Sequence, residues 1–202
     1  MKMIADEPSK SVRYVYKPSV AGSPFSLELT AQGLSFSTGF RSDSWSYSDI
    51  AEIRLTYRPV SMLRHRFRAD LRHRNARKLR IVSATWAGIV ALTPQSEDYR
   101  AFIEELHRHL AAERSGVVCV AGLPKFVFVL ASATFALLML AILGLAFRAL
   151  FGGSLEGLQQ QAIAVLFLFG FAGWSAWYAG GWLLRNKPRR YDPAQVPKDL
   201  LP

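Results

Sequence analysis

The chain has 202 residues, 50% of them hydrophobic, and carries a formal net charge of +10. This length allows one domain of ordinary size together with a membrane segment, and a single cysteine, Cys119, excludes an intramolecular disulfide. We interpret Cys119 as a small apolar residue of the run VVCVAG. The first ten residues contain no apolar stretch, and we therefore expect no cleaved signal peptide.

Residues 1–12 are polar and expected to be loose, whereas residues 13–115 are predicted to form a domain of short antiparallel strands. Hydrophobic and polar residues alternate along several segments, which is typical of strands with one wet face. These segments are 25–30, 34–37, 45–47, 51–57, 65–73 and 78–82. Gly33 is expected to supply a positive φ angle to the first turn, and Pro59 to end the strand at 51–57. Residues 83–92 fit either a further strand or a loop with a buried Trp86.

The hydrophobic period changes near the end of this domain, where a stripe with helical spacing predicts an amphipathic helix. The stripe consists of Tyr99, Phe102, Ile103, Leu106 and Leu110. Ser96 is expected to cap the start of this helix, and Gly116 to stop it.

Two uncharged apolar stretches follow, and each is long enough to cross a bilayer as a helix. The first contains 22 consecutive residues between Lys125 and Arg148, and the second ends at Arg185. We predict transmembrane helices at about 126–148 and 162–184, within a hairpin that occupies residues 125–185.

The charge distribution predicts the topology of this hairpin. Residues 1–125 carry 19 basic and 12 acidic residues, residues 185–202 carry five and two, and the connection between the spans carries one of each. Because positive charge marks the cytoplasmic side, we expect both termini in the cytoplasm, the loop 149–161 outside, and two spans in the inner (plasma) membrane. The basic tail, 186–202, contains four prolines and is expected to be extended, either lying across the domain or waiting for a partner.

The order of elements, several strands closed by one helix, resembles that of pleckstrin-homology-like (PH-like) domains. The segment WSYSDI at 45–50, followed by AEIRL at 51–55, resembles the strand entry of bacterial PH-like and GRAM-like domains. The resemblance covers residues 13–112 and implies an α+β fold: an antiparallel PH-like barrel or sheet with one C-terminal amphipathic helix, here followed by a transmembrane hairpin. It implies a binding domain and no activity. Eukaryotic PH domains that bind inositides carry a basic motif in the first hairpin loop. The first hairpin expected here, around 31–33, carries no basic residue, and we therefore do not expect inositide recognition.

The strongest candidate for a binding site is the stretch 54–80, which contains ten basic residues and one acid, Asp70. Strand alternation is expected to place five arginines on one face, namely Arg64, Arg66, Arg68, Arg72 and Arg74. Guanidinium groups match phosphate, and a basic residue near an anionic leaflet adds about 1 kcal/mol. A solvated sheet face, contact with anionic lipid headgroups and an acidic protein partner all stay open, whereas the strand-like pattern and the membrane tether argue against nucleic acid.

Catalytic chemistry finds no support in the sequence. The four histidines lack the spacing of a metal site, and no phosphate loop, Ser/His/Asp order or cysteine pair is present. We therefore expect no catalytic residue, no metal and no cofactor.

The second span carries glycines that are expected to pack against another helix, which is either the first span or a second chain: Gly170, Gly173 and Gly180. The function that these features favour is a non-enzymatic adaptor, anchored in the membrane, whose basic domain contacts anionic lipid or a protein partner. The alternative is an accessory subunit of a larger envelope or transport complex, or a homodimer, that docks through its transmembrane helices.

Overall fold

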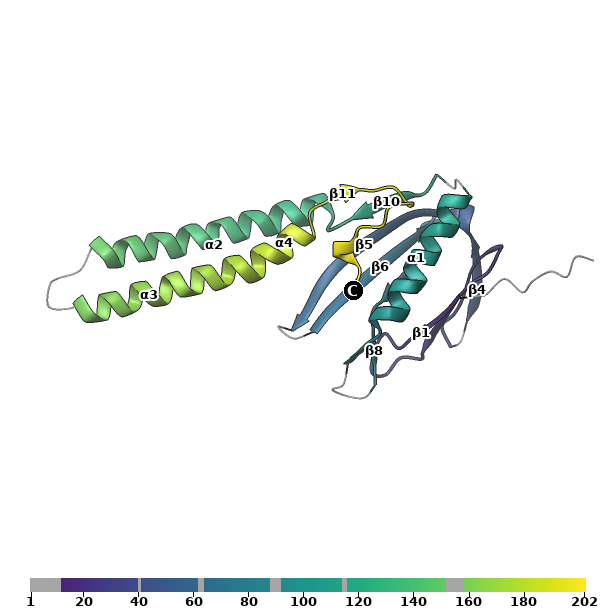
Figure 1. Ribbon diagram of the computed structural model, residues 1–202, viewed down its shortest axis with the longest axis horizontal. Coiled ribbons are helices and arrows are strands. Elements are labelled where there is room, and N and C mark those ends of the chain that lie inside the picture. The colour runs from purple at the N-terminus through teal and green to yellow at the C-terminus, as the bar shows by residue number, and fades with distance from the viewer. Residues whose placement is uncertain (1–11, 40, 62–63, 88–91, 114–115, 152–157) are drawn as a thin grey trace, which may run out of the picture. The chain divides into compact units, whose positions relative to one another are not determined.

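The computed structural model describes residues 12–39, 41–61, 64–87, 92–113, 116–151 and 158–202 (Figure 1). The chain divides into two compact units. We call residues 1–122 together with 189–202 the sheet unit, and residues 123–188 the helical hairpin.

A four-stranded antiparallel sheet begins the sheet unit, with its strands in chain order. The strands are β1 (Val12–Tyr16), β2 (Phe25–Leu29), β3 (Gly33–Ser37) and β4 (Ser42–Ser46). Alternation directs Leu27, Leu34 and Trp45 into the core, because successive strand residues point to opposite faces. The strands predicted at 25–30 and 34–37 are confirmed by β2, which ends one residue earlier, and by β3.

A second sheet has five strands in the order β11-β10-β5-β6-β7. Its members are β5 (Ile50–Ser61), β6 (Arg64–His73), β7 (Lys78–Val82), β10 (Val118–Ala121) and β11 (Arg189–Arg190). The sheet is mixed rather than purely antiparallel, because β10 runs parallel to β5. The ambiguous stretch after β7 forms part of a small hairpin of β8 (Ala84–Trp86) and β9 (Leu92–Pro94), in which Trp86 is only half-buried.

Two sequence expectations about the backbone of these strands are wrong. Gly33 does not adopt a positive φ angle; glycine is required there because a Cβ would lie 2.3 Å from the carbonyl oxygen of Trp45 on the neighbouring strand. Pro59 does not end its strand, since β5 continues to Ser61. The register between β5 and β6 shifts between Pro59 and Ser61, and such an irregularity accommodates a residue without an N–H group.

The amphipathic helix is α1 (Ser96–Ala112), and the predicted stripe from Tyr99 to Leu110 is buried in the core. Its cap position is Gln95 rather than Ser96, which is already helical. The ring of Tyr14 on β1 lies 6.1 Å from that of Tyr99 and 5.6 Å from that of Phe102, which joins α1 to the first sheet.

The two sheets do not close into a barrel through backbone pairing of the described strands. Side chains connect them instead. The Tyr14 hydroxyl donates a hydrogen bond of 2.7 Å to the carbonyl oxygen of Val82, and the Tyr16 hydroxyl donates one to that of Arg80. The architecture is therefore α+β with two sheets that share a core but keep separate hydrogen-bond ladders.

The C-terminal segment, 189–202, folds as part of the sheet unit, so of the two readings that the sequence left open it lies across the domain. After β11, Leu200 and Leu201 are buried, and the short 3-10 turn Lys198–Leu200 packs on β5. The guanidinium of Arg189 reaches the Asp199 carboxylate at 2.6 Å. The segment thus adds both a strand and apolar contacts to the core.

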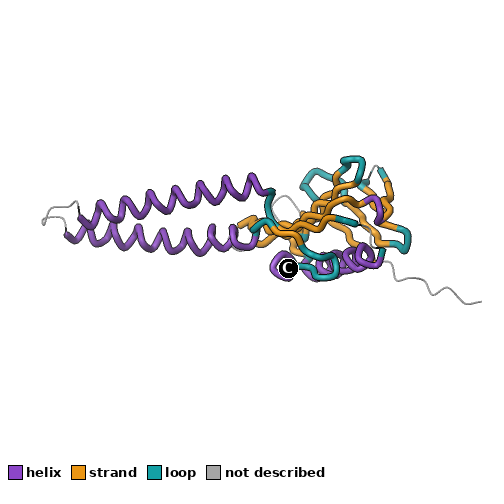
Figure 2. The backbone as a smooth tube through the Cα atoms, turned by 90° about the horizontal axis from the view of Figure 1, so that it is seen from above, coloured by secondary structure: helices purple, strands orange, loops and turns teal. Residues whose placement is uncertain are grey.

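The helical hairpin consists of α2 (Lys125–Phe151), α3 (Leu158–Ser175), a π-helical turn (Ala176–Gly180) and α4 (Gly181–Arg185), seen as paired helices in Figure 2. The helices 125–151 and 159–185 are long and apolar enough to cross a membrane. The amide of Leu123 donates to the carbonyl oxygen of Asn186 at 3.0 Å, which holds the two ends of the hairpin together. The connection 152–157 lies outside the described residues.

Candidate functional site

The strongest concentration of charge in the sheet unit lies on the face of β5, β6 and β7 that points away from the core. Phe67, Ala69 and Leu71 of β6 are buried, so alternation directs their neighbours to the opposite face. We call this opposite face the arginine face; it comprises Glu52, Arg54, Thr56, Arg58, Arg66, Arg68, Asp70, Arg72, Lys78 and Arg80. The register sets Arg58 directly opposite Arg66, and Thr56 directly opposite Arg68.

Two carboxylates balance only part of this positive charge. Glu52 accepts from Arg54 at 2.8 Å on the same strand. Asp70 is shared by two arginines, since Arg68 lies 2.6 Å from one of its oxygens and Arg80 lies 3.3 Å from the other. The face therefore holds more guanidinium groups than its own acids can pair.

Four of these arginines, Arg58, Arg66, Arg68 and Arg80, influence one another electrostatically, and we call them the arginine cluster. Burial, followed by the proximity of Arg68 and Arg80, lowers the pKa of the Arg66 guanidinium. Burial and the same two neighbours also lower the pKa of Arg58. Arg58 and Arg66 nevertheless stay protonated at neutral pH, because a guanidinium group is not deprotonated in proteins. The lowered pKa values of Arg58 and Arg66 therefore indicate that burial and the neighbouring positive charges disfavour the charged form of both groups.

Three polar atoms at this cluster are buried and have no hydrogen-bond partner among the described residues, namely Arg66 Nε, Arg68 Nε and Thr56 Oγ1. Thr56 is only 4% exposed. A buried donor without a partner costs about 1–3 kcal/mol, and like charges directly opposite on neighbouring strands add to that cost. An anion bound at the cluster would offset both costs at once.

The five arginines expected from the sequence do not all belong to this cluster. Arg66 and Arg68 do, whereas Arg72 lies farther along β6, opposite Glu52. Arg74 lies in the turn after β6, where its Nε donates to the carbonyl oxygen of Ser48 at 2.7 Å. Arg64 begins β6, but its side chain lies outside what the structure describes.

Arg58 and Arg80 are the members of the cluster that sequence reasoning missed. Both sit on strands next to β6 and reach the cluster only through cross-strand register. Alternation along 51–57, continued by one residue, places Arg58 on the outer face. The alternation thus indicated Arg58, but the strand was expected to end before Pro59.

His107 and His109 occupy structural positions. His107 is buried between α1 and the C-terminal segment, with Nδ1 2.7 Å from the carbonyl oxygen of Ile103 and Nε2 2.9 Å from the hydroxyl of Tyr191. His109 stacks on the ring of Tyr47. Within the described residues, no group of three or more potential metal ligands comes together.

The glycines of the second helix take different positions within the hairpin. A Cβ at Gly180 would lie 4.0 Å from the ring of Phe135 on α2, whereas one at Gly170 or Gly173 would meet no atom within 4 Å. The buried residues of the hairpin include Ala172 and Ser175 instead. Contact between the two helices thus involves alanine and serine as well as Gly180.

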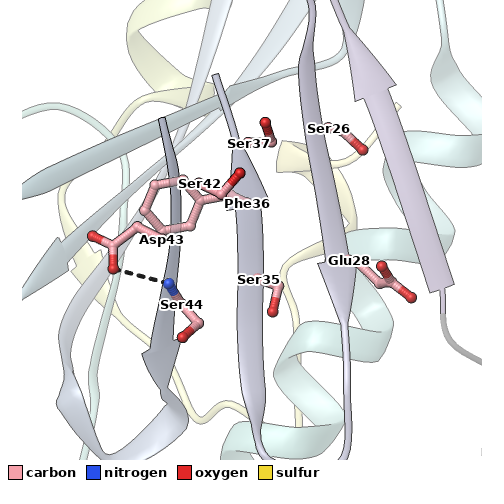
Figure 3. Close-up of a pocket in the computed structure, with 8 residues that line it drawn as sticks. All are labelled: Ser26, Glu28, Ser35, Phe36, Ser37, Ser42, Asp43 and Ser44. Carbon is pink, nitrogen blue, oxygen red and sulfur yellow. Dashed lines mark hydrogen bonds between the residues drawn. The ribbon is translucent and has the colours of Figure 1, made fainter. Parts of the chain in front are cut away.

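A second feature of the sheet unit is a shallow hollow of about 470 Å³ on the outer face of β2, β3 and β4 (Figure 3). Serine hydroxyls and Glu28 line it, together with Phe36 and Asp43. The Asp43 carboxylate accepts from the Ser44 amide at 2.9 Å and pairs with Arg77. The hollow offers hydroxyl groups but no charge cluster comparable to that of the arginine face.

Comparison of the chain with models of protein families, with curated proteins and with solved structures finds no match.

Proposed function

We propose that the protein is a non-enzymatic binding module anchored in the inner membrane, whose arginine face contacts the anionic headgroups of the cytoplasmic leaflet. The observation that carries this proposal is the surplus of guanidinium groups on one sheet face of a chain that also has two apolar helices of membrane-spanning length. Each basic residue near an anionic leaflet contributes about 1 kcal/mol.

The order of elements supports a PH-like binding domain. Four antiparallel strands are followed by the three antiparallel strands β5–β7, by the small β8–β9 hairpin and then by α1. Several strands closed by one helix is the order of the family that the sequence resembles. Strands β10 and β11 extend the second sheet beyond that pattern. We place any ligand contact on the outer face of β5–β7, because the basic residues gather there.

Lipid retention by the full chain tests this proposal. The protein is purified in a neutral detergent, titrated with phosphatidylglycerol or phosphatidylcholine of matched acyl chains, and examined by native mass spectrometry. We expect stronger retention of phosphatidylglycerol, and we expect added salt to weaken it because salt screens exposed charge. Changing Arg66, Arg68 and Arg72 to Gln should remove most of the difference between the two lipids.

The matched control removes the same charge elsewhere in the sheet unit by changing Arg13, Arg41 and Arg108 to Gln. This variant should retain phosphatidylglycerol as the wild type does. Equal retention of the two lipids by the wild type, or equal losses in both triple variants, contradicts the proposal and leaves a solvated face or an acidic protein partner as the better account.

A second candidate function is docking into a larger membrane complex or a homodimer through the second transmembrane helix. The observation that favours it is the open space at Gly170 and Gly173, which α2 does not fill. Small residues allow close helix approach in a bilayer. Cross-linking in native membranes tests it, because Gly173→Leu should then abolish a cross-linked product that the wild type forms.

A further inference from the structure

The feature that leads beyond general charge attraction is the group of buried, unpartnered polar atoms inside the arginine face. Arg66 Nε, Arg68 Nε and Thr56 Oγ1 have no hydrogen-bond partner among the described residues. A solvated basic face needs none of this, because exposed guanidinium groups bond to water. We propose that Arg58, Arg66 and Arg68, together with Thr56, form a discrete site for a phosphate monoester group.

The strand register brings these side chains together. Arg58 is directly opposite Arg66, and Thr56 is directly opposite Arg68, so the four residues occupy two adjacent rungs of the β5–β6 ladder. Directly opposite residues on one face have Cβ atoms about 4.5–5.5 Å apart. The three arginines and the threonine thus occupy neighbouring positions on one sheet face, over an area that matches one small anion.

Charge selects the kind of anion. The arginine cluster has four positive charges and one carboxylate, Asp70, which pairs with Arg68 and Arg80. The remaining charge exceeds what a monoanion neutralises. A phosphate monoester carries about −1.5 to −2 at neutral pH and presents three free oxygens, whereas a phosphodiester or a carboxylate carries a single charge and presents two.

Asp70 also orients part of the site in the absence of a ligand. Its 2.6 Å pairing with Arg68 orients that guanidinium through a terminal nitrogen and leaves Nε unused. Arg80 is held twice, by its 3.3 Å contact with Asp70 and by the Tyr16 hydroxyl at its backbone carbonyl. The Arg68 guanidinium is therefore oriented before the ligand binds.

This inference rests on the proposed function and specifies the chemical class of the ligand. The monoester belongs either to a lipid headgroup of the phosphatidic acid type or to a soluble phosphorylated molecule. The chemistry of recognition is the same in both cases, and the experiment separates the two sources.

The first arm measures soluble binding by calorimetry on the full chain in neutral detergent and phosphate-free buffer. Glycerol 3-phosphate is the probe, and dimethyl phosphate is the diester control. We expect glycerol 3-phosphate to bind saturably and dimethyl phosphate not to bind. Arg66→Lys keeps the charge but loses the Nε donor and the planar fork, and should weaken binding at least about tenfold.

Arg54→Gln is the matched control, because Arg54 lies on the same face but is already paired with Glu52. It should bind glycerol 3-phosphate as the wild type does. Absence of glycerol 3-phosphate binding together with no preference for phosphatidic acid, or equal loss in Arg54→Gln and Arg66→Lys, would overturn the discrete site.

The second arm compares phosphatidic acid with phosphatidylglycerol by native mass spectrometry. Stronger retention of phosphatidic acid, lost in Arg66→Lys, supports the site and identifies the headgroup as the source. Soluble binding without that preference supports the site and identifies a soluble ligand.

Equal retention of both lipids without soluble binding overturns the monoester site but leaves the proposed function standing. Soluble binding without retention of either anionic lipid supports the site and contradicts the proposed function.

A third measurement compares thermal stability without and with glycerol 3-phosphate. Because Arg58 faces Arg66, Arg58→Thr should raise the melting temperature in phosphate-free buffer. The same variant should lose the stabilisation that glycerol 3-phosphate gives the wild type. An unchanged phosphate response in Arg58→Thr contradicts the assignment.

Discussion

At the scale of single residues, His107 shows how burial fixes a protonation state. The carbonyl oxygen of Ile103 can only accept, so Nδ1 carries the proton, and Nε2 accepts from the Tyr191 hydroxyl. Burial lowers the pKa of His107 below its ordinary value of 6.5. The neutral ring therefore belongs to the folded state, and it ties α1 to the segment after β11.

This arrangement predicts a pH dependence of stability. Since the unfolded chain takes up a proton on His107 at a higher pH than the folded chain does, stability is full above pH 6.5 and falls as the pH drops below that value. The melting temperature of the full chain, measured from pH 7.5 to 5.0, should fall more steeply for the wild type than for His107→Gln. His109→Gln is the control and should follow the wild type. Identical slopes for the wild type and His107→Gln would show that His107 does not contribute.

At the scale of elements, the small residues of α3 differ in their surroundings, because some are buried within the hairpin and others are open. Ala172 and Ser175 are buried, three residues apart on one side of α3, whereas Gly173 lies open within the hairpin. Residues three or four apart share one helix face, so Ala172 and Ser175 form one packing surface. Composition alone does not reveal this, because glycine and alanine are both small.

A matched pair of substitutions follows from this difference. Ala172→Leu inserts volume into a packed contact and should destabilise the detergent-purified monomer by about 1–3 kcal/mol. Gly173→Leu should leave the melting temperature of the monomer unchanged or raise it, because leucine favours a helix over glycine by up to about 1 kcal/mol. An equal loss at both positions would mean that Gly173 packs against α2 after all.

The strands β10 and β11 matter for any experiment on the isolated domain. They lie on the two chain segments that flank the hairpin, and they pair with each other, Ala121 opposite Arg189. A fragment that ends at residue 115 lacks both strands and the buried Leu200 and Leu201. For this reason the binding experiments use the full chain.

At the scale of the whole molecule, the fold constrains the topology. Segments before and after the hairpin belong to one sheet, so both must lie on the same side of a membrane that the hairpin crosses. The charge distribution then favours the cytoplasm for that side. These arguments are independent, since one rests on strand pairing and the other on Lys and Arg counts.

Reporter fusions test this topology. A reporter that is active only outside the cytoplasm should be inactive when fused after residue 202 and active when inserted within 152–157, and a cytoplasmic reporter should show the reverse. Placing reporters at both sites is the control for expression of each fusion. Activity of the external reporter after residue 202 contradicts a cytoplasmic sheet unit.

The sequence by itself determined the features that depend on local order. Strand alternation at 25–30, 65–73 and 78–82 and the stripe of α1 follow from periodicity, which local geometry dictates. The two apolar helices follow from the length of their uncharged stretches. The basic stretch of 54–80 could also be read directly, together with its candidate residues Arg66 and Arg68.

Only the tertiary structure decided which segments meet. The pairing of β10 with β5 and β11 joins residues far apart in the chain, and four or two residues are too short to show a period. The same holds for the arginine cluster, because Arg58, Arg66 and Arg80 approach one another only through the register of three strands. Register depends on packing across the whole sheet, and local sequence does not contain it.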